Sequence, residues 1–292
     1  MQVLVHGGAG SAPDDPEPRQ VVVDDAATAG AKCATPQAAV LAAVHRLEAD
    51  PRFNAGTGSV VQSDGTIRTD AGLMTHDGAV GAACAMPGVE HAVDVAEVVK
   101  DETPHVMVAG ERAVSLAETV GVATDCDLWT PATRDRWAEA DPPADATTRE
   151  QLAWVREQFG TDDARDHDTV GAVATDGQRL AAATSTGGRW FALAGRVGDV
   201  PQVGAGFYAT PTAAVSATGE GEAIARFGLA RCVADAVADG EAPQHAADRV
   251  LRGFATETDG EAGVIVVDAD GRTGRANNTE AMQTAADTSE QP

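Results

Sequence analysis

A threonine and four glycine- and hydroxyl-rich turns make up the part of this 292-residue chain best suited to chemistry. Thr169 opens an apolar, strand-like run directly after a polar segment. A threonine hydroxyl becomes a useful nucleophile only with a base beside it. Taken alone, Thr169 is ordinary, because β-branched residues favour strands. The turns that follow it change this interpretation.

Each of the four turns combines small residues with polar groups, and one carries an arginine and an aspartate. Glycines let backbone N–H groups approach a ligand closely. Arg196 can hold a carboxylate through two parallel hydrogen bonds, and Asp199 can hold an ammonium group. Together they predict a binding site for a small zwitterion. The turns are residues 184–188 (Thr-Ser-Thr-Gly-Gly), 195–199 (Gly-Arg-Val-Gly-Asp), 204–206 (Gly-Ala-Gly) and 218–221 (Thr-Gly-Glu-Gly).

These motifs give the chain a recognisable pattern from end to end. It resembles the plant-type L-asparaginase/isoaspartyl peptidase family of N-terminal nucleophile hydrolases. The resemblance implies an α+β fold, a four-layer αββα sandwich, in one domain over residues 1–292. The matching segments are residues 6–10 (His-Gly-Gly-Ala-Gly), 53–59 (Phe-Asn-Ala-Gly-Thr-Gly-Ser), Asp70-Ala71 with Met74, 169–221 and the late strand 263–268.

The same resemblance implies that the precursor cuts itself between Asp168 and Thr169. The products would be an α chain of residues 1–168 and a β chain of 169–292, with two αβ units pairing into a heterotetramer. Cleavage would create a free α-amine on Thr169, whose reference pKa of ~7.7–8.0 suits a base. Activity would therefore depend on maturation.

The remaining site residues are assigned by resemblance. Their substrate would be asparagine or a β-aspartyl dipeptide, cleaved through a β-aspartyl ester on Thr169. Thr186 would orient the nucleophile, and Thr218 with the backbone N–H of Gly219 would form the oxyanion hole. Arg196 would bind the α-carboxylate, while Asp199 and the Gly221 carbonyl would bind the α-ammonium group.

No cofactor is required for this chemistry, but the resemblance implies a structural sodium ion. Asn54 is expected to lie near the nucleophile in a supporting role. Backbone carbonyls would hold the ion, those of Leu47, Glu48, Asp50, Phe53, Ala55 and Thr57.

Two features depart from the pattern and leave alternatives. Asparaginase-branch relatives usually carry glycine before the nucleophile, whereas His167-Asp168 here matches the sister glycosylasparaginases. Residues 53–59 and 218–221 favour the plant-type branch. Arg189-Trp190 is unusual and is expected to alter substrate preference. A third hypothesis is an uncleaved, non-catalytic binding protein, although such a protein would not need all three threonine hydroxyls.

The charge balance excludes some classes of function. Asp and Glu number 45 against 21 Lys and Arg, which gives a formal net charge of -24. Such a chain cannot neutralise phosphates, so we expect no nucleic-acid partner. No run approaches the ~18 apolar residues of a membrane span, and no signal peptide is evident, which predicts a cytoplasmic protein. An acidic, lysine-poor chain with 43% hydrophobic residues is typical of salt-loving organisms.

Other motifs that suggest chemistry fail on inspection. The seven histidines lack H-E-x-x-H spacing, and the four cysteines lack C-x-x-C spacing, so neither set predicts a catalytic zinc or redox site. Gly8-Ala9-Gly10 hints at dinucleotide binding, but Pro16 and Pro18 are expected to leave no room for the helix which that fold requires.

The turns must be held by regular elements, and strand- and helix-like segments alternate along the chain. Residues 3–5 read as a buried strand. Residues 169–174 and 180–185 read as a hairpin around the turn Asp176-Gly177. A helix is expected after the capping pair Thr35-Pro36, ending before Asp50-Pro51.

Three further segments carry expectations. The polar stretch of residues 125–168 is expected to be mobile, with one helix after a capping box formed by Thr147 and Glu150. A single long helix is expected over residues 222–237. The tail from Ala285 is polar and is expected to fray.

Overall fold

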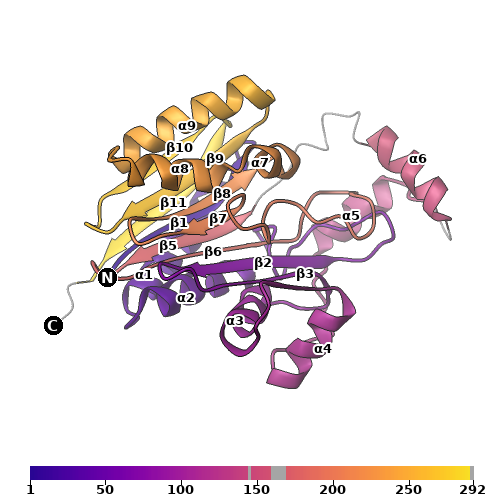
Figure 1. Cartoon of the computed structure of the whole chain (residues 1–292). Helices are drawn as coiled ribbons and strands as arrows, with labels where there is room; N and C mark the ends of the chain where they lie inside the picture. Colours follow the sequence, from indigo (N-terminus) through magenta and orange to yellow (C-terminus); the bar gives the residue numbers. More distant parts are fainter. Residues whose placement is uncertain (144–145, 159–168, 290–292) are drawn as a thin grey trace.

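Two β-sheets packed face to face, with helices on both outer surfaces, form the computed structural model of this chain (Figure 1). The structure describes residues 1–143, 146–158 and 169–289. This arrangement confirms the expected α+β fold with four layers.

The larger sheet has seven strands in the order β11-β1-β5-β6-β2-β3-β4. Its pairs are antiparallel except for β3 and β4. The expected hairpin is confirmed as β5 and β6, with Gly177 in the turn at φ 88°. The strands are β1 (Gln2–Gly10), β2 (Arg68–Thr75), β3 (Val80–Pro87), β4 (Met107–Ala109), β5 (Val170–Thr175), β6 (Leu180–Thr186) and β11 (Ala281–Thr288).

The smaller sheet is antiparallel throughout, in the order β10-β9-β8-β7. Its strands β8 and β9 lie against β1, β5 and β6 of the larger sheet. The strands are β7 (Phe207–Ala209), β8 (Ala213–Gly219), β9 (Ala262–Asp268) and β10 (Thr273–Asn277).

Helices cover the outer face of each sheet. α1, α2 and α3 pack on the larger sheet, and α8 and α9 on the smaller one. The expected cap of α2 is confirmed, since Oγ1 of Thr35 accepts the N–H of Ala38 at 3.2 Å. The helices are α1 (Pro16–Ala31), α2 (Pro36–Glu48), α3 (Ala92–Glu102), α4 (Glu111–Val120), α5 (Pro131–Glu139), α6 (Thr148–Gln158), α7 (Gly221–Phe227), α8 (Leu229–Ala238) and α9 (Pro243–Thr258).

Strand alternation assigns every residue of the larger sheet to one of two faces. Leu4, Val173 and Met74 share the inner face and pack against the smaller sheet. Val5 and Ala172 point to the outer face, under the helices. The face to which a side chain points therefore decides whether it contacts β8 on the inner side or α2 on the outer side.

Several sequence expectations were wrong, each for a local reason. Pro16 and Pro18 do not exclude a helix, because α1 starts at Pro16, where the missing N–H costs nothing. Residues 222–237 are not one helix, because Gly228 in the left-handed region (φ 72°) separates α7 from α8. The tail is not frayed over residues 285–288, because β11 pairs with β1.

The polar stretch before Thr169 contains more structure than expected. The Thr147–Glu150 capping box is confirmed, since the N–H of Thr147 donates to Oε2 of Glu150 at 2.8 Å. A second helix, α5, was missed; it begins after Thr130, whose Oγ1 accepts the N–H of Thr133 at 3.0 Å. The segment 159–168, expected to be mobile, lies outside the described residues.

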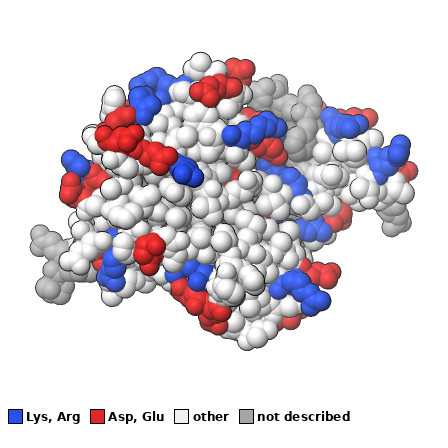
Figure 2. All heavy atoms as spheres, viewed as in Figure 1, with Lys and Arg blue, Asp and Glu red and all other residues white. Residues whose placement is uncertain are grey.

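Charged side chains are spread over the visible face of the molecule, with both signs interspersed (Figure 2). Among the described residues, no helix has both the length and the apolar character that a membrane span requires.

Candidate active site

Thr169 lies at the end of a row of side chains that crosses three strands. The β5–β6 register pairs Val170 with Ser185, so the next position places Thr169 opposite Thr186. Thr186 is itself paired with Asp70 on β2. All three side chains are buried, at 5%, 3% and 3% exposure, and the alternation turns them toward the smaller sheet. Two hydroxyls and a carboxyl therefore lie side by side on the face of the larger sheet that packs against the smaller sheet.

The smaller sheet supplies the third hydroxyl. Oγ1 of Thr218, near the end of β8, accepts the backbone N–H of Thr169 at 3.2 Å. The next residue, Gly219, has φ 129°, where a Cβ atom would lie 2.4 Å from the carbonyl oxygen of Glu261. Only glycine fits this turn, which follows directly after the contact between Thr218 and Thr169.

A buried histidine, His6 on β1, lies beside β5, the strand that follows Thr169. Nε2 of His6 and Oγ of Ser216 are 2.6 Å apart, joining β1 to β8. Burial lowers the pKa of His6 to about 3, although a hydrogen bond to the backbone of Thr169 acts in the opposite direction. His6 is therefore neutral at pH 7 and ties the two sheets together close to Thr169.

Arg196 is held flat among glycines and an acidic partner. Its Nε donates to Oε1 of Glu222 at 2.9 Å, and its Nη2 donates to Oε2 at 2.8 Å. A Cβ atom on Gly198 would lie 2.9 Å from Nη1, and one on Gly221 would lie 2.7 Å from Nη2. Burial favours a neutral guanidinium, but the hydrogen bonds and charge of Glu222 raise the pKa of Arg196 overall.

Glu222 is ionised as firmly as Arg196. Burial alone would raise its pKa, but the hydrogen bonds and charge of Arg196 lower the pKa of Glu222 to about 2. This pairing was not expected from the sequence, which assigned a substrate carboxylate to Arg196 and named no acidic partner for it. In the described part of the chain, Nη1 of Arg196 forms no hydrogen bond and borders Gly188 and Gly198.

Asp199 lies beside Gly221, close to this ion pair. Its side chain is 4% exposed, and no described residue forms a hydrogen bond with its Oδ2. Burial raises the pKa of Asp199 to about 7, although Arg196 lowers it in part. A Cβ atom on Gly221 would come within 2.9 Å of Oδ1. A buried carboxyl with an unpaired oxygen can accept an ammonium donor.

Asp70 is the second carboxyl with a raised pKa. Burial raises the pKa of Asp70 to about 7, opposed by the N–H of Ala85 and by the charge of Arg196. The N–H of Ala85 donates to Oδ1 at 2.7 Å, at a bulge between β2 and β3. Asp70 therefore contributes to the site's electrostatics while also holding the strand geometry.

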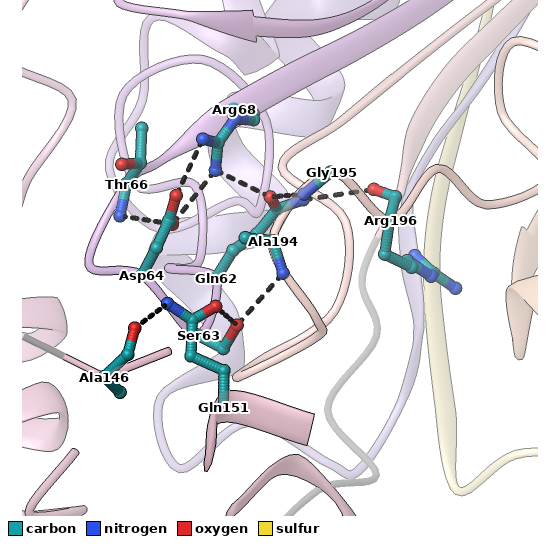
Figure 3. A network of polar contacts seen from close by, with 10 residues as sticks. All are labelled: Gln62, Ser63, Asp64, Thr66, Arg68, Ala146, Gln151, Ala194, Gly195 and Arg196. Carbon is teal, nitrogen blue, oxygen red and sulfur yellow. Dashed lines mark hydrogen bonds and ion pairs between the residues drawn. The ribbon is translucent and has the colours of Figure 1, made fainter. Parts of the chain in front are cut away.

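A polar network fixes the loop that carries Arg196 (Figure 3). Oε1 of Gln62 accepts the N–H of Gly195 at 2.8 Å, and its Nε2 donates to the Arg196 carbonyl at 3.0 Å. Arg68 donates to the same Oε1 at 2.8 Å and pairs with Asp64. The sequence analysis did not identify Gln62, because no local pattern indicates a hydrogen bond to Gly195, which lies 133 positions further along the chain.

Asn54 supports the turn that follows β6. Its Nδ2 donates to the Gly188 carbonyl at 2.7 Å, and its backbone carbonyl accepts the N–H of Gly187 at 2.9 Å. The N–H of Gly188 in turn donates to Oγ1 of Thr186 at 3.0 Å. Asn54 therefore lies close to the threonine row and fixes its surroundings.

The loop expected to hold sodium is closed by a hydrogen bond, and several carbonyl oxygens lie close to its glycines. The N–H of Thr57 donates to the Glu48 carbonyl at 2.8 Å. A Cβ atom on Gly56 would lie 2.3 Å from that oxygen, and one on Gly58 would lie 2.7 Å from the Phe53 carbonyl oxygen. Carbonyl oxygens keep a second lone pair after one hydrogen bond, so this loop suits a hard cation.

The structure thus brings the expected residues together where the ends of β5, β6 and β8 meet. The expected cleavage residue Asp168 lies outside the described residues. Glu222 was missed, although its place directly after Gly221 was a signal. The residues brought together are Thr169, Thr186, Thr218, Gly219, Arg196, Asp199, Gly221 and Asn54.

Comparison with known proteins matches this arrangement to one family. The family described as Asparaginase matches residues 1–292. A plant-type L-asparaginase of Pyrococcus furiosus is 37% identical over 297 residues, covering 98% of this chain and 95% of its own length. One of Pyrobaculum calidifontis is 41% identical over 294 residues, covering 96% and 94%. An isoaspartyl peptidase/L-asparaginase of Danio rerio is 38% identical over 281 residues, covering 92% and 86%. The resemblance carried by the motifs is confirmed: the chain belongs to the asparaginase family.

Proposed function

We propose that this protein hydrolyses L-asparagine and β-aspartyl dipeptides with Thr169 as the nucleophile, after cleaving its own chain before that residue. The observation that carries the proposal is the 3.2 Å contact between the nitrogen of Thr169 and Oγ1 of Thr218. It brings the future α-amine, the nucleophile and an oxyanion donor to one point. The relatives named above support the two substrate classes.

Maturation begins with attack of the Thr169 hydroxyl on the carbonyl carbon of Asp168. The C–N bond breaks, the nitrogen takes a proton, and an ester to Oγ1 replaces the amide. Water then hydrolyses the ester, which leaves a carboxylate on Asp168 and a free α-amine on Thr169. The amine supplies the base that a threonine nucleophile needs.

Turnover repeats the attack on the substrate's side-chain amide. The α-amine of Thr169 takes the proton from Oγ1 as the tetrahedral intermediate forms. The hydroxyl of Thr218 and the N–H of Gly219 stabilise the oxyanion, and Thr186 orients the nucleophile. Ammonia or an amino acid leaves with a proton, and water releases aspartate from the ester.

Recognition of the aspartyl half follows from the two charged groups beside Gly221. Arg196 has an edge left for a carboxylate after pairing with Glu222. The unpaired Oδ2 of Asp199 accepts from the α-ammonium group, together with the Gly221 carbonyl. Both substrate classes present the same half, so the site accepts either leaving group.

Mass spectrometry of the incubated protein, followed by product assays, tests this proposal. The wild type should yield chains of residues 1–168 and 169–292 and release ammonia from asparagine. Thr169→Ala should stay a single chain without hydrolysis, whereas Thr169→Ser should cleave more slowly. Thr184→Val is the matched control, because Thr184 is buried on β6 and donates only to the Val200 carbonyl. Normal chains from Thr169→Ala would refute the assignment.

A substrate panel separates the alternatives. Asparagine, a β-aspartyl dipeptide and glycosylated asparagine should be assayed side by side. Preference for the glycosylated substrate would replace the proposal with a glycosylasparaginase. An intact wild-type chain that binds aspartate without turnover would indicate a non-catalytic binding protein.

Two further parts of the proposal concern assembly. A sodium ion held by the loop of residues 47–57 would stabilise the segment that positions Asn54. Exchange of sodium for a bulky organic cation should then lower the melting temperature. Two αβ units are proposed to pair, which sedimentation of the cleaved protein tests directly.

A further inference from the structure

A second cluster of chemically active side chains lies on the opposite face of the larger sheet from Thr169. His45 and Glu48 are three positions apart on α2, so they share one face of the helix. His91 precedes the first turn of α3 and faces them. One donor atom from each of the three lies within 4.8 Å of the other two.

Groups outside the cluster hold one oxygen of Glu48, and the other oxygen contacts His91. The side chain of Glu48 is fully buried. Oε1 accepts the hydroxyl of Ser185 at 2.6 Å and the N–H of Val93 at 3.2 Å. Oε2 is left directed toward Nδ1 of His91, 3.2 Å away. A buried carboxylate oriented by two outer donors resembles the way proteins fix metal ligands.

His45 is oriented by a carboxylate as well. Its Nε2 is hydrogen-bonded to Oδ1 of Asp94, which lies in the first turn of α3. This bond leaves Nδ1 as the nitrogen open to a ligand. A carboxylate that accepts from the far nitrogen of a histidine fixes its tautomer and raises its basicity toward a metal. The rings of His45 and His91 lie 4.6 Å apart between centroids.

From this arrangement we propose a site for a divalent transition metal ion of the zinc type, ligated by His45, Glu48 and His91. Two imidazoles and one carboxylate suit such an ion, and water completes four-coordination. Zinc–nitrogen bonds of ~2.0–2.1 Å place tetrahedral ligands about 3.4 Å apart, so donor atoms that now lie up to 4.8 Å apart must close by about 1.4 Å at most.

Position in the fold gives the ion a route in and a structural role. The side chains of His45 and His91 are 37% and 30% exposed, so the ion enters from solvent. Once bound, it joins α2 to α3, and Glu48 extends the link to β6 through Ser185. Ser185 points toward the helices, whereas its neighbour Thr186 points to the opposite face of the sheet, where Thr169 lies. The ion therefore takes no part in the reaction.

The site can be tested by calorimetric titration of chelator-treated protein with zinc chloride. The buffer should contain enough sodium to fill the proposed sodium site beforehand. The wild type should bind one ion per chain and melt at a higher temperature with zinc. His45→Ala and His91→Ala should each weaken binding by about tenfold or more, as loss of a ligand or its support does. His245→Ala is the matched control, because His245 pairs with Glu241 on the surface of α9 without a second histidine.

Cobalt substitution distinguishes this site from the four free cysteines. The expected spectrum has the visible bands of a four-coordinate ion and no sulfur-to-cobalt charge transfer. His91→Gln serves if His91→Ala does not fold. The proposal would be overturned if the wild type bound no zinc, which would leave only ion pairs between α2 and α3. It would also be overturned if both histidine variants bound zinc as tightly as the wild type, or if a sulfur-to-cobalt band appeared.

Discussion

Glu222 accepts two hydrogen bonds from Arg196, one from Nε at 2.9 Å and one from Nη2 at 2.8 Å. The bidentate contact fixes the plane of the guanidinium group between the backbones of Gly198 and Gly221. It also balances one charge inside the proposed site, so that a substrate carboxylate would meet an oriented group whose remaining edge includes Nη1. In the proposed function, Glu222 would thus serve binding by orienting the guanidinium group of Arg196.

Glu222→Gln should therefore weaken substrate binding without blocking self-cleavage. The amide cannot accept on both atoms, so Arg196 loses one charge-assisted hydrogen bond and its fixed orientation. Such bonds contribute ~1.5–3 kcal/mol, which predicts a fall in kcat/KM of about 10- to 100-fold, mostly in KM.

The control for this variant is Glu220→Gln, at the neighbouring N-cap of α7, whose side chain forms no cap hydrogen bond. Steady-state kinetics on asparagine and chain analysis by mass spectrometry should be run on both variants. An unchanged KM in Glu222→Gln would mean that Arg196 is oriented without it.

Gly221→Ala should damage the same site by crowding. The added Cβ atom would lie 2.7 Å from Nη2 of Arg196 and 2.9 Å from Oδ1 of Asp199, so both groups must move. We expect kcat/KM for asparagine to fall by about tenfold or more, because misplacement by ~1 Å is costly in a positioned site.

Gly253→Ala makes the matched comparison for added volume. A Cβ atom at this position in α9 meets nothing within 4 Å. Alanine in a helix interior is favoured over glycine by ~0.8–1.0 kcal/mol, so the melting temperature should rise by about 1–3 °C. Its kcat/KM should match the wild type; a loss in both variants would point to a general effect on folding.

The pH dependence of kcat/KM should report Asp199. Because burial raises the pKa of Asp199 to about 7, its carboxyl is protonated and neutral at lower pH and cannot pair with an ammonium group. Activity should therefore rise as pH increases through 7. A second rise is expected near the ~7.7–8.0 reference pKa of the α-amine of Thr169.

Two variants test which carboxyl causes the rise in kcat/KM near pH 7, when kcat/KM is measured from about pH 5.5 to 9. Asp199→Asn should lose the step near 7 and bind substrate more weakly at all pH values. Asp70→Asn should keep it, although the pKa of Asp70 is also raised to about 7. A step that vanishes only in Asp70→Asn would move the titration to that carboxyl.

Salt should stabilise this protein. A formal charge of -24 imposes self-repulsion, which salt screens as the Debye length falls from ~30 Å at 0.01 M to ~3 Å at 1 M. We expect the melting temperature to rise by about 5 °C or more between about 0.05 M and 3 M potassium chloride. An uncharged osmolyte at matched osmolality is the control. A flat response would contradict adaptation to salt and leave the catalytic proposal untouched.

Local patterns in the sequence were sufficient for much of the chemistry. The Thr35 cap, the Thr147–Glu150 capping box and the hairpin around Gly177 were predicted, because each depends on hydrogen bonds within a few residues. The threonine and glycine motifs identified the family for the same reason, since they specify turns and hydroxyls at fixed spacing.

The tertiary structure decided which residues from other strands and helices contact those motifs. Asp70 faces Thr186 only because β2 pairs with β6, and β11 forms only because β1 offers an edge to a polar tail. Glu222, rather than Asp199, pairs with Arg196 because α7 begins beside the guanidinium group.

The histidine cluster shows the same division between near and distant contacts. The spacing of His45 and Glu48 on one helix is visible in the sequence, yet their partner His91 lies 43 positions from Glu48. Packing of α2 and α3 on one sheet face brings them together. Burial of apolar surface brings such distant residues together. Because the hydrophobic effect is not directional, no local sequence pattern shows which residues will become neighbours.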